Sequence, residues 1–336
     1  MGTGAGACTE REITSVVDLC NADGKLRADA VGWSRRPLHH CALPGSWGRR
    51  KRWDFWGLTG PGCAMNVVVA DVDYVGITGV WFCDFATGRS IEKGSVSPLG
   101  RRMALPETVG GAPISSRARS LDLEMSEEER GTRIRVASSG IEADVLVVRP
   151  DWHESLGVVI PWSAKRFQYT NKDVARPAEG WARWKGENFE FSWGCLDFGR
   201  GKWPYRTRWN WGAGAGVVDG VTVGVQVGGK WTDGTGMTEN ALVVDGKLSK
   251  ISEDLVWAYD TSNWLRPWRI RTPRSDRVDL TFTPIHDKAT RLQLGALSQR
   301  VDQCFGTYSG RIVPDGGSSL QVEGLFGWAE EATWRW

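Results

Sequence analysis

Apolar and polar residues alternate with a period of two along several stretches of this chain, which is the pattern of half-buried β-strands. The clearest stretch is 221–227, where four valines alternate with threonine, glycine and glutamine. Each such run offers one apolar face to a core. Other alternating or continuously β-branched runs lie at 133–136, 278–282, 67–69 and 145–148. Strands therefore account for most of the regular structure that the sequence predicts.

Asp-Gly pairs separate the predicted strands at five places, and this dipeptide favours the tight turns of β-hairpins. The pairs begin at Asp23, Asp219, Asp233, Asp245 and Asp315. Helical patterns are poor by comparison, and only the segment 288–303 lets helix compete with strand. We therefore predict an all-β fold with many antiparallel strands, arranged as two barrels or as bent double sheets.

The length of 336 residues favours two domains. Prolines and glycines indicate a less regular segment at 161–180, and the glycine-alanine tract 212–216 opens a new series of hairpins. We place the boundary close to residue 204. This predicts an N-terminal β-barrel domain at 1–203 and a C-terminal β-barrel domain at 204–336.

The overall charge excludes some classes of partner. Lysine and arginine (42) nearly balance aspartate and glutamate (40), so the net charge of +2 provides no field that would attract nucleic acid. No run of about 18 apolar residues predicts a membrane span, and no signal peptide is recognised. Seven scattered cysteines and four histidines lack metal-ligand spacing. We expect free thiols, no metal, no cofactor and a cytoplasmic location, and the sequence indicates no particular oligomeric state.

Tryptophan is concentrated in one segment of the chain. Six of the 20 tryptophans lie between residues 181 and 211, around the carboxyl of Asp197. Stacked indole faces bind apolar or sugar ligands and stabilise positive charge, so the cluster predicts an aromatic-walled cavity. The alternative is that these large side chains fill the core of a β-protein. The residues expected to contact a ligand are Trp193, Trp203, Trp209, Trp211, Trp231, Arg200 and Lys230.

Asp197 is the residue that we expect to act as a general acid in this cavity. Desolvation by indole rings favours the neutral form of a carboxyl, which can then hold a proton for donation. Proton donation to an alkene leads to hydration, cyclisation or isomerisation when the walls tolerate carbocation character. The alternative is that Asp197 forms a structural ion pair with Arg200, Arg206 or Arg208.

Three glutamates in the C-terminal part are further catalytic candidates, namely Glu239, Glu330 and Glu331. Adjacent residues on a strand point to opposite faces, so at most one of Glu330 and Glu331 should face a given interior. Two carboxylates that met across the cavity would instead favour glycoside cleavage. The alternative for each glutamate is a buried ion pair with Lys230, Arg269 or Arg271.

Three further strings of residues are distinctive, namely GGKWTDGTGMTEN at 228–240, KISED at 250–254 and GWAEE at 327–331. They resemble the bacterial domain family DUF2804, whose name conveys no activity. The resemblance extends from about Glu10 to the last residue, so it covers nearly the whole chain.

A second resemblance concerns the tryptophan cluster. The string WGCLD at 193–197, with Trp203 and WNW at 209–211 after it, is similar to the domain-junction motif of the lipocalin-like carotenoid hydratase and AttH group. This resemblance implies two consecutive lipocalin-like barrels, and relatives of that group include cyclases. Those motifs usually carry a histidine or arginine and then an acidic or amide residue after the aspartate. Here Phe198 and Gly199 follow it, so the resemblance implies the fold rather than the chemistry.

The sequence therefore predicts a cofactor-free hydratase, lyase, cyclase or isomerase that acts by acid catalysis on an apolar, isoprenoid-like or polyketide-like small molecule. One alternative is a non-catalytic lipid or isoprenoid carrier, which needs no deeply placed acid. Another is a carbohydrate-active enzyme, which needs two facing carboxylates in an open groove.

Overall fold

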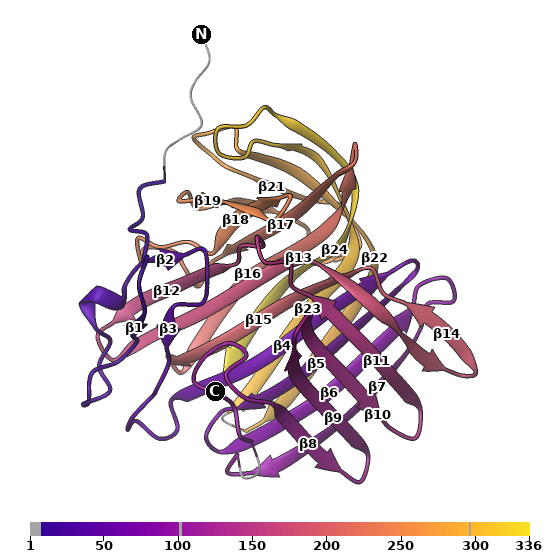
Figure 1. Cartoon of the computed structure of the whole chain (residues 1–336), viewed down its shortest axis with the longest axis horizontal. Helices are drawn as coiled ribbons and strands as arrows, with labels where there is room; N and C mark the ends of the chain where they lie inside the picture. The colour runs from indigo at the N-terminus through magenta and orange to yellow at the C-terminus, as the bar shows by residue number, and fades with distance from the viewer. Residues whose placement is uncertain (1–7, 101–102, 296) are drawn as a thin grey trace.

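The computed structural model describes residues 8–100, 103–295 and 297–336, and it confirms the prediction of an all-β fold. Within this part of the chain the helical structure is a single 3-10 turn at Ala28–Ala30, and no helix is long and apolar enough to cross a membrane. Two large sheets build the molecule (Figure 1), and a short parallel pair joins β1 (Val17–Asp18) to β3 (His39–His40).

The first sheet has 13 strands in the order β7-β6-β5-β4-β15-β13-β11-β10-β9-β8, with β12 and β14 also paired to β13 and β2 paired to β12. Its strands are β2 (Trp33–Ser34), β4 (Arg50–Gly60), β5 (Cys63–Asp71), β6 (Val75–Asp84), β7 (Arg89–Pro98), β8 (Ile114–Ala118), β9 (Leu121–Glu128), β10 (Gly131–Ala137), β11 (Ile141–Val148), β12 (Leu156–Ser163), β13 (Arg166–Trp184), β14 (Glu187–Glu190) and β15 (Trp193–Lys202).

The second sheet has nine strands in the order β19-β18-β17-β16-β24-β23-β22-β21-β20. Its strands are β16 (Arg206–Val218), β17 (Val221–Gly229), β18 (Asn240–Val244), β19 (Lys247–Ile251), β20 (Val256–Ala258), β21 (Trp268–Arg271), β22 (Val278–Leu294), β23 (Leu297–Ile312) and β24 (Leu320–Arg335). The chain passes from the first sheet to the second between residues 202 and 206.

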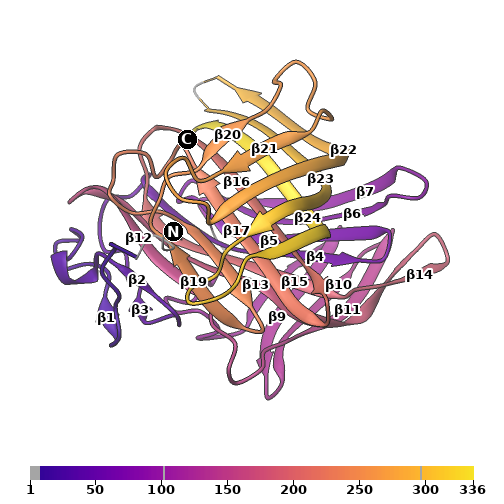
Figure 2. The same cartoon turned by 90° about the horizontal axis from the view of Figure 1, so that it is seen from above.

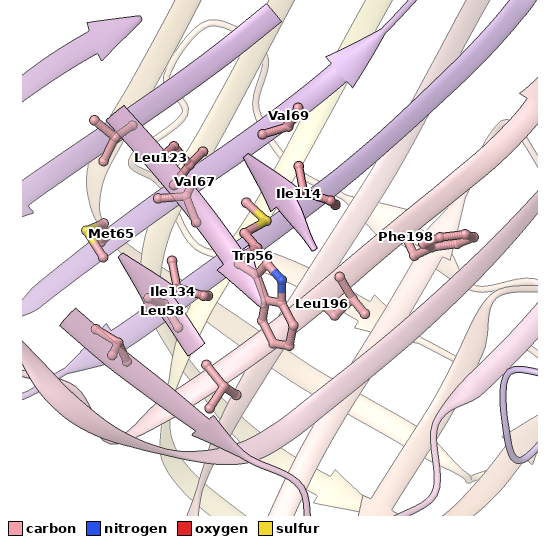
Figure 3. Close-up of a cluster of buried hydrophobic side chains, with 14 of the residues drawn as sticks. Trp56, Leu58, Met65, Val67, Val69, Ile114, Leu123, Ile134, Leu196 and Phe198 are labelled. Carbon is pink, nitrogen blue, oxygen red and sulfur yellow. The ribbon is translucent and has the colours of Figure 1, made fainter. Parts of the chain in front are cut away.

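The first sheet curls into a nearly closed barrel around its own apolar core. The two ends of the sheet, β6–β7 and β8, contact each other. The hydroxyls of Thr78 and Ser116 lie 2.7 Å apart, and Ser120 donates a hydrogen bond of 3.1 Å to the Gly94 carbonyl. Side chains of alternate residues fill the interior, as Figure 3 shows for Trp56 and its neighbours. This barrel interior is therefore a packed core.

The second sheet covers one outer face of the first, and Figures 1 and 2 show its orange and yellow strands lying against the purple and rose strands. A separate apolar cluster joins the two sheets, and it includes Trp81, Trp211, Phe305 and Trp328. The rings of Trp81 and Phe305, which belong to different sheets, are stacked with centroids 5.0 Å apart. The tryptophan-rich segment therefore lies between the sheets.

The predicted turns explain several connections between neighbouring strands. Asp219 and Gly220 have φ values of 50° and 82°, and Asp245 and Gly246 have 46° and 77°. Positive φ at both central residues is what a tight type I′ hairpin turn requires.

Two local expectations differ from the structure. The segment 288–303 is the tip of the β22–β23 hairpin, so its pattern belongs to strands. The segment expected to be less regular at 161–180 lies largely in β13, the longest strand, where a bulge between Asp173 and Arg176 absorbs the irregularity.

The seven cysteines are all free thiols, and five of them are buried. Cys8 and Cys20 retain some exposed surface, although burial raises the pKa of Cys20 to about 11. We expect a thiol reagent to modify at most these two cysteines in the native protein and all seven in denaturant. Counting the modified thiols by mass spectrometry checks this, and rapid modification of Cys195 or Cys304 would contradict the burial.

Candidate active site

A cavity of about 630 Å³ lies between the two sheets, and both contribute to its walls. Strands β4 to β7, β13 and β15 line one side, and β16 and β22 to β24 line the other. Among the lining residues, Glu92 and Val96 on β7 are exposed. The aromatic residues in its walls are Trp53, Phe55, Trp203, Trp209, Trp211, Trp231, Trp334 and Trp336.

Strand alternation decides which polar groups of β15 reach this cavity. Asp197 lies on the face that turns toward the second sheet, whereas Leu196 and Phe198 point into the barrel core. Arg200 is three residues further along, so it lies on the opposite face. There it is fully buried and pairs with Asp54 at 2.6 Å. The predicted role of Arg200 in ligand contact is therefore not supported by its position.

Asp197 is ion-paired inside the cavity wall with a residue that the sequence analysis did not consider. Lys172 on β13 lies directly opposite Asp197 in the ladder, and its ammonium is 2.9 Å from Asp197 Oδ2. Thr170 donates a hydrogen bond of 2.9 Å to the other oxygen. Asp197 thus has Lys172 as its cation, and not one of the three arginines weighed from the sequence.

Glu239 completes a buried charge cluster around Lys172. The Lys172 ammonium is 3.5 Å from Glu239 Oε2, and the Trp231 indole donates to Oε1. The carboxyl packs on Gly228, where a Cβ atom would come within 2.2 Å of Oε1. Burial raises the pKa of Glu239 to about 7, although the charge of Lys172 opposes the shift.

The two carboxyls stabilise the charged form of Lys172. Burial alone would lower its pKa, but the charges of Asp197 and Glu239 outweigh burial, so the pKa is raised. The ammonium also lies 3.9 Å from the centroid of the Trp211 ring, a distance that suits a cation–π contact. The cluster therefore combines one cation, two carboxyls and an indole face.

Glu330 on β24 is the third carboxyl that faces the cavity. Trp209 donates to its Oε1 at 2.8 Å, and Gln303 donates to its Oε2 at 2.9 Å. Burial raises the pKa of Glu330 to about 7, although the hydrogen bond from Trp209 and the charges of Lys172 and Lys288 oppose the rise. No ion pair to Glu330 is formed within the described residues, so this carboxyl can carry a proton near neutral pH.

Glu331 points to the other face of β24, as alternation along a strand requires. There it pairs with Lys230 at 2.9 Å and also contacts Arg300 and the Tyr259 hydroxyl. This is the Lys230 ion pair that the sequence left open. Neither Glu331 nor Lys230 lines the cavity among the described residues.

The indole walls form one continuous contact network. Trp203 stacks on Trp231 with centroids 5.6 Å apart and an interplanar angle of 10°, and it meets Trp209 edge-on at 6.0 Å. Trp336 approaches Trp203 at 5.5 Å and Trp334 at 4.4 Å. These rings present a large aromatic surface beside the carboxyl of Glu330.

Of the predicted site residues, the structure brings one group together at the cavity and leaves another outside. The cavity group consists of Asp197, Glu239, Glu330, Trp203, Trp209, Trp211 and Trp231. Trp193 shares the face of Asp197 but lies four residues away, roughly 13 Å along the strand, in a separate niche of about 10 Å³. The sequence analysis missed Thr170, Lys172, Lys288, Gln303, Trp334 and Trp336, although the last two continue the even-numbered face of Glu330.

Comparisons with known proteins agree with this architecture. The model of the domain of unknown function DUF2804 matches residues 10–336. An AttH-like protein of Nitrosomonas europaea is 13% identical, with coverage of 87% of this chain and 98% of that one, at a TM-score of 0.51. Kievitone hydratase of Nectria haematococca is 10% identical, with coverage of 88% and 94%, at a TM-score of 0.49. No curated protein matches the sequence. The first structural likeness confirms at the level of fold the resemblance to the AttH group.

Proposed function

Since this chain belongs to the DUF2804 family, whose description names no activity, we propose a function from the cavity itself. The protein is a cofactor-free lyase, hydratase, cyclase or isomerase that protonates an unsaturated, largely apolar small molecule. Glu330 is the general acid. The observation that supports this most is a buried carboxyl with a pKa of about 7 that faces an indole-lined cavity.

The first step is a proton transfer from the Glu330 carboxyl to one carbon of a double bond. The π electrons form the new C–H bond, Glu330 becomes a carboxylate, and the neighbouring carbon becomes cationic. The indole faces of Trp203 and Trp209 in the cavity wall favour this cation.

The second step removes the positive charge in one of two ways. Loss of a proton from an adjacent carbon to the Glu239 carboxylate gives an isomer, or a cyclised product after internal attack by another double bond. Attack by a water molecule, which releases its proton to the same carboxylate, gives a hydrated product. Glu239 suits this role because its pKa of about 7 lets it accept a proton as readily as Glu330 donates one.

The alternative of a non-catalytic carrier does not account for the polar groups in the wall. A carrier of apolar molecules gains nothing from burying carboxyls, since each buried charge costs free energy. Here Asp197, Glu239 and Glu330 all line the same cavity. Their presence favours an enzyme. A carbohydrate-active enzyme remains a second candidate, because its chemistry needs a pair of carboxyls and three share this aromatic-walled space.

Deuterium incorporation separates these functions. The small molecule that co-purifies with the protein is identified by native mass spectrometry, extracted, and incubated with fresh protein in heavy water. We expect the recovered molecule to carry deuterium bound to carbon, because the exchanged Glu330 carboxyl delivers it. A ligand returned without deuterium would indicate a carrier, and recovery of a sugar would favour glycoside cleavage.

A further inference from the structure

Lys288 differs from the other deeply placed lysines of this protein. The buried lysines each have protein partners: Lys172 pairs with Asp197 at 2.9 Å, Lys250 with Glu10 at 2.8 Å, Lys202 donates to Gly24 and Pro44 carbonyls, and Lys51 donates to the Val72 carbonyl. Lys288 makes no hydrogen bond and no ion pair with any described residue, and its ammonium lies 5.5 Å from the centroid of the Trp81 ring, within the range of a cation–π contact. Its ammonium therefore has an aromatic ring beside it but no anion from the described part of the chain.

The surroundings of Lys288 show that it faces the cavity. Lys288 lines the cavity and is partly exposed. Burial lowers its pKa, while the charges of Glu92 and Glu330 partly offset this effect. An ammonium that faces an apolar-walled cavity and has no anion beside it is a favourable site for a charge-assisted hydrogen bond to an anionic ligand.

The position of Lys288 relative to the proposed acid is set by the sheet. Lys288 is opposite Gln303 on β23, and Gln303 is opposite Glu330 on β24. Neighbouring strands are about 4.8 Å apart, so the Cα atoms of Lys288 and Glu330 are separated by roughly 10 Å. An anion at Lys288 would therefore leave the next few carbons of the same molecule beside Glu330 and the indoles.

We infer that Lys288 binds an anionic head group of the substrate, a carboxylate or an ionised enol, so that the substrate is an amphipathic organic acid. Its unsaturated apolar part lies against the indole walls. The inference rests on the proposed function, because it specifies the class of substrate that the enzyme would take. The binding step itself can be measured without turnover.

Matched probes test the inference by isothermal titration calorimetry with the full chain. We expect dodecanoate to bind at least 10-fold more tightly than dodecanol, because a charge-assisted hydrogen bond contributes more than a neutral one. Lys288→Met should remove this preference while dodecanol still binds, and Lys288→Arg should retain most of it. Circular dichroism confirms that each variant is folded.

Lys230 provides the control, because its ammonium pairs with Glu331 and it does not line the cavity among the described residues. Lys230→Met should keep the preference for dodecanoate. The inference is wrong if Lys288→Met keeps the preference, if Lys230→Met loses it, or if the wild-type protein binds neither probe. Loss of turnover in a Glu330 variant that still prefers dodecanoate would separate the two proposals, since binding would persist without proton transfer.

Discussion

Glu330→Gln should reduce turnover by roughly 100-fold or more, because it removes the proton donor but keeps the shape of the side chain. Glutamine can still accept the hydrogen bond from Trp209, which is 2.8 Å in the wild type. Binding of the co-purified ligand should therefore change little. The measurement is a single-turnover assay of deuterium incorporation, with binding measured on the same preparations.

Glu239→Gln is the matched control for this substitution, since Glu239 is also buried with a pKa of about 7. It should preserve proton donation to the ligand and impair only the later loss of a proton. If Glu239→Gln abolishes incorporation while Glu330→Gln does not, the two glutamates have exchanged roles. If neither has an effect, the general acid is elsewhere.

The raised pKa of Glu330 also determines the sign of a pH effect on stability. Its pKa rises from 4.5 to about 7 on folding, so the folded protein holds a proton that the unfolded chain releases. The wild type therefore loses stability as pH rises through this window, by up to about 3 kcal/mol. The variant Glu330→Gln lacks this loss. The difference between its melting temperature and that of the wild type should therefore be more favourable to the variant at about pH 8 than at about pH 5.

Lys172→Met should destabilise the fold by about 3–5 kcal/mol, because it leaves Asp197 and Glu239 buried without their cation. The Lys172 ammonium lies within 3.5 Å of both carboxyls, and its side chain is 5% exposed. The loss should be larger at about pH 8 than at about pH 5, since Glu239 can take up a proton at the lower pH. Urea unfolding monitored by circular dichroism measures both values.

Two further variants make this test specific. The double variant Lys172→Met with Asp197→Asn should recover much of the loss, because the uncompensated charge of Asp197 is then gone. Lys230→Met breaks a more exposed pair with Glu331 and should cost less. A loss below about 1 kcal/mol for Lys172→Met would show that this cluster does not need its cation for stability.

The fold could be predicted from the sequence because the pattern that indicates each strand lies within that strand and its adjoining turn. The valines of 221–227 and the turn at Asp219 are local signals, and they determine β17 and its hairpin without any knowledge of distant residues. The separation of Glu330 from Glu331 is equally local, since it follows from alternation. Even the position of Arg200 could have been derived, because it is an odd number of residues from Asp197.

The partners of the site residues could not be predicted in this way. Lys172 reaches Asp197 only because β13 and β15 pair in one particular register, which a bulge within β13 helps to set. Glu239 and Glu330 reach the same cavity through the docking of the second sheet. Lys288 lay in the one segment where helix competed with strand, so its face was undetermined.

The strand order of the second sheet has a consequence for biosynthesis. Strand β24 lies in the middle of that sheet, between β16 and β23, although it follows all the other strands along the chain. The ribosome therefore delivers β16 long before its central neighbour exists, and β16 cannot complete its ladder until β24 has emerged. Until then the sheet that covers the aromatic face of the first sheet is incomplete, and exposed apolar surface of this kind makes a folding intermediate prone to aggregation. Glu330 is part of β24, so the same late strand supplies the acid and completes the cover of the cavity.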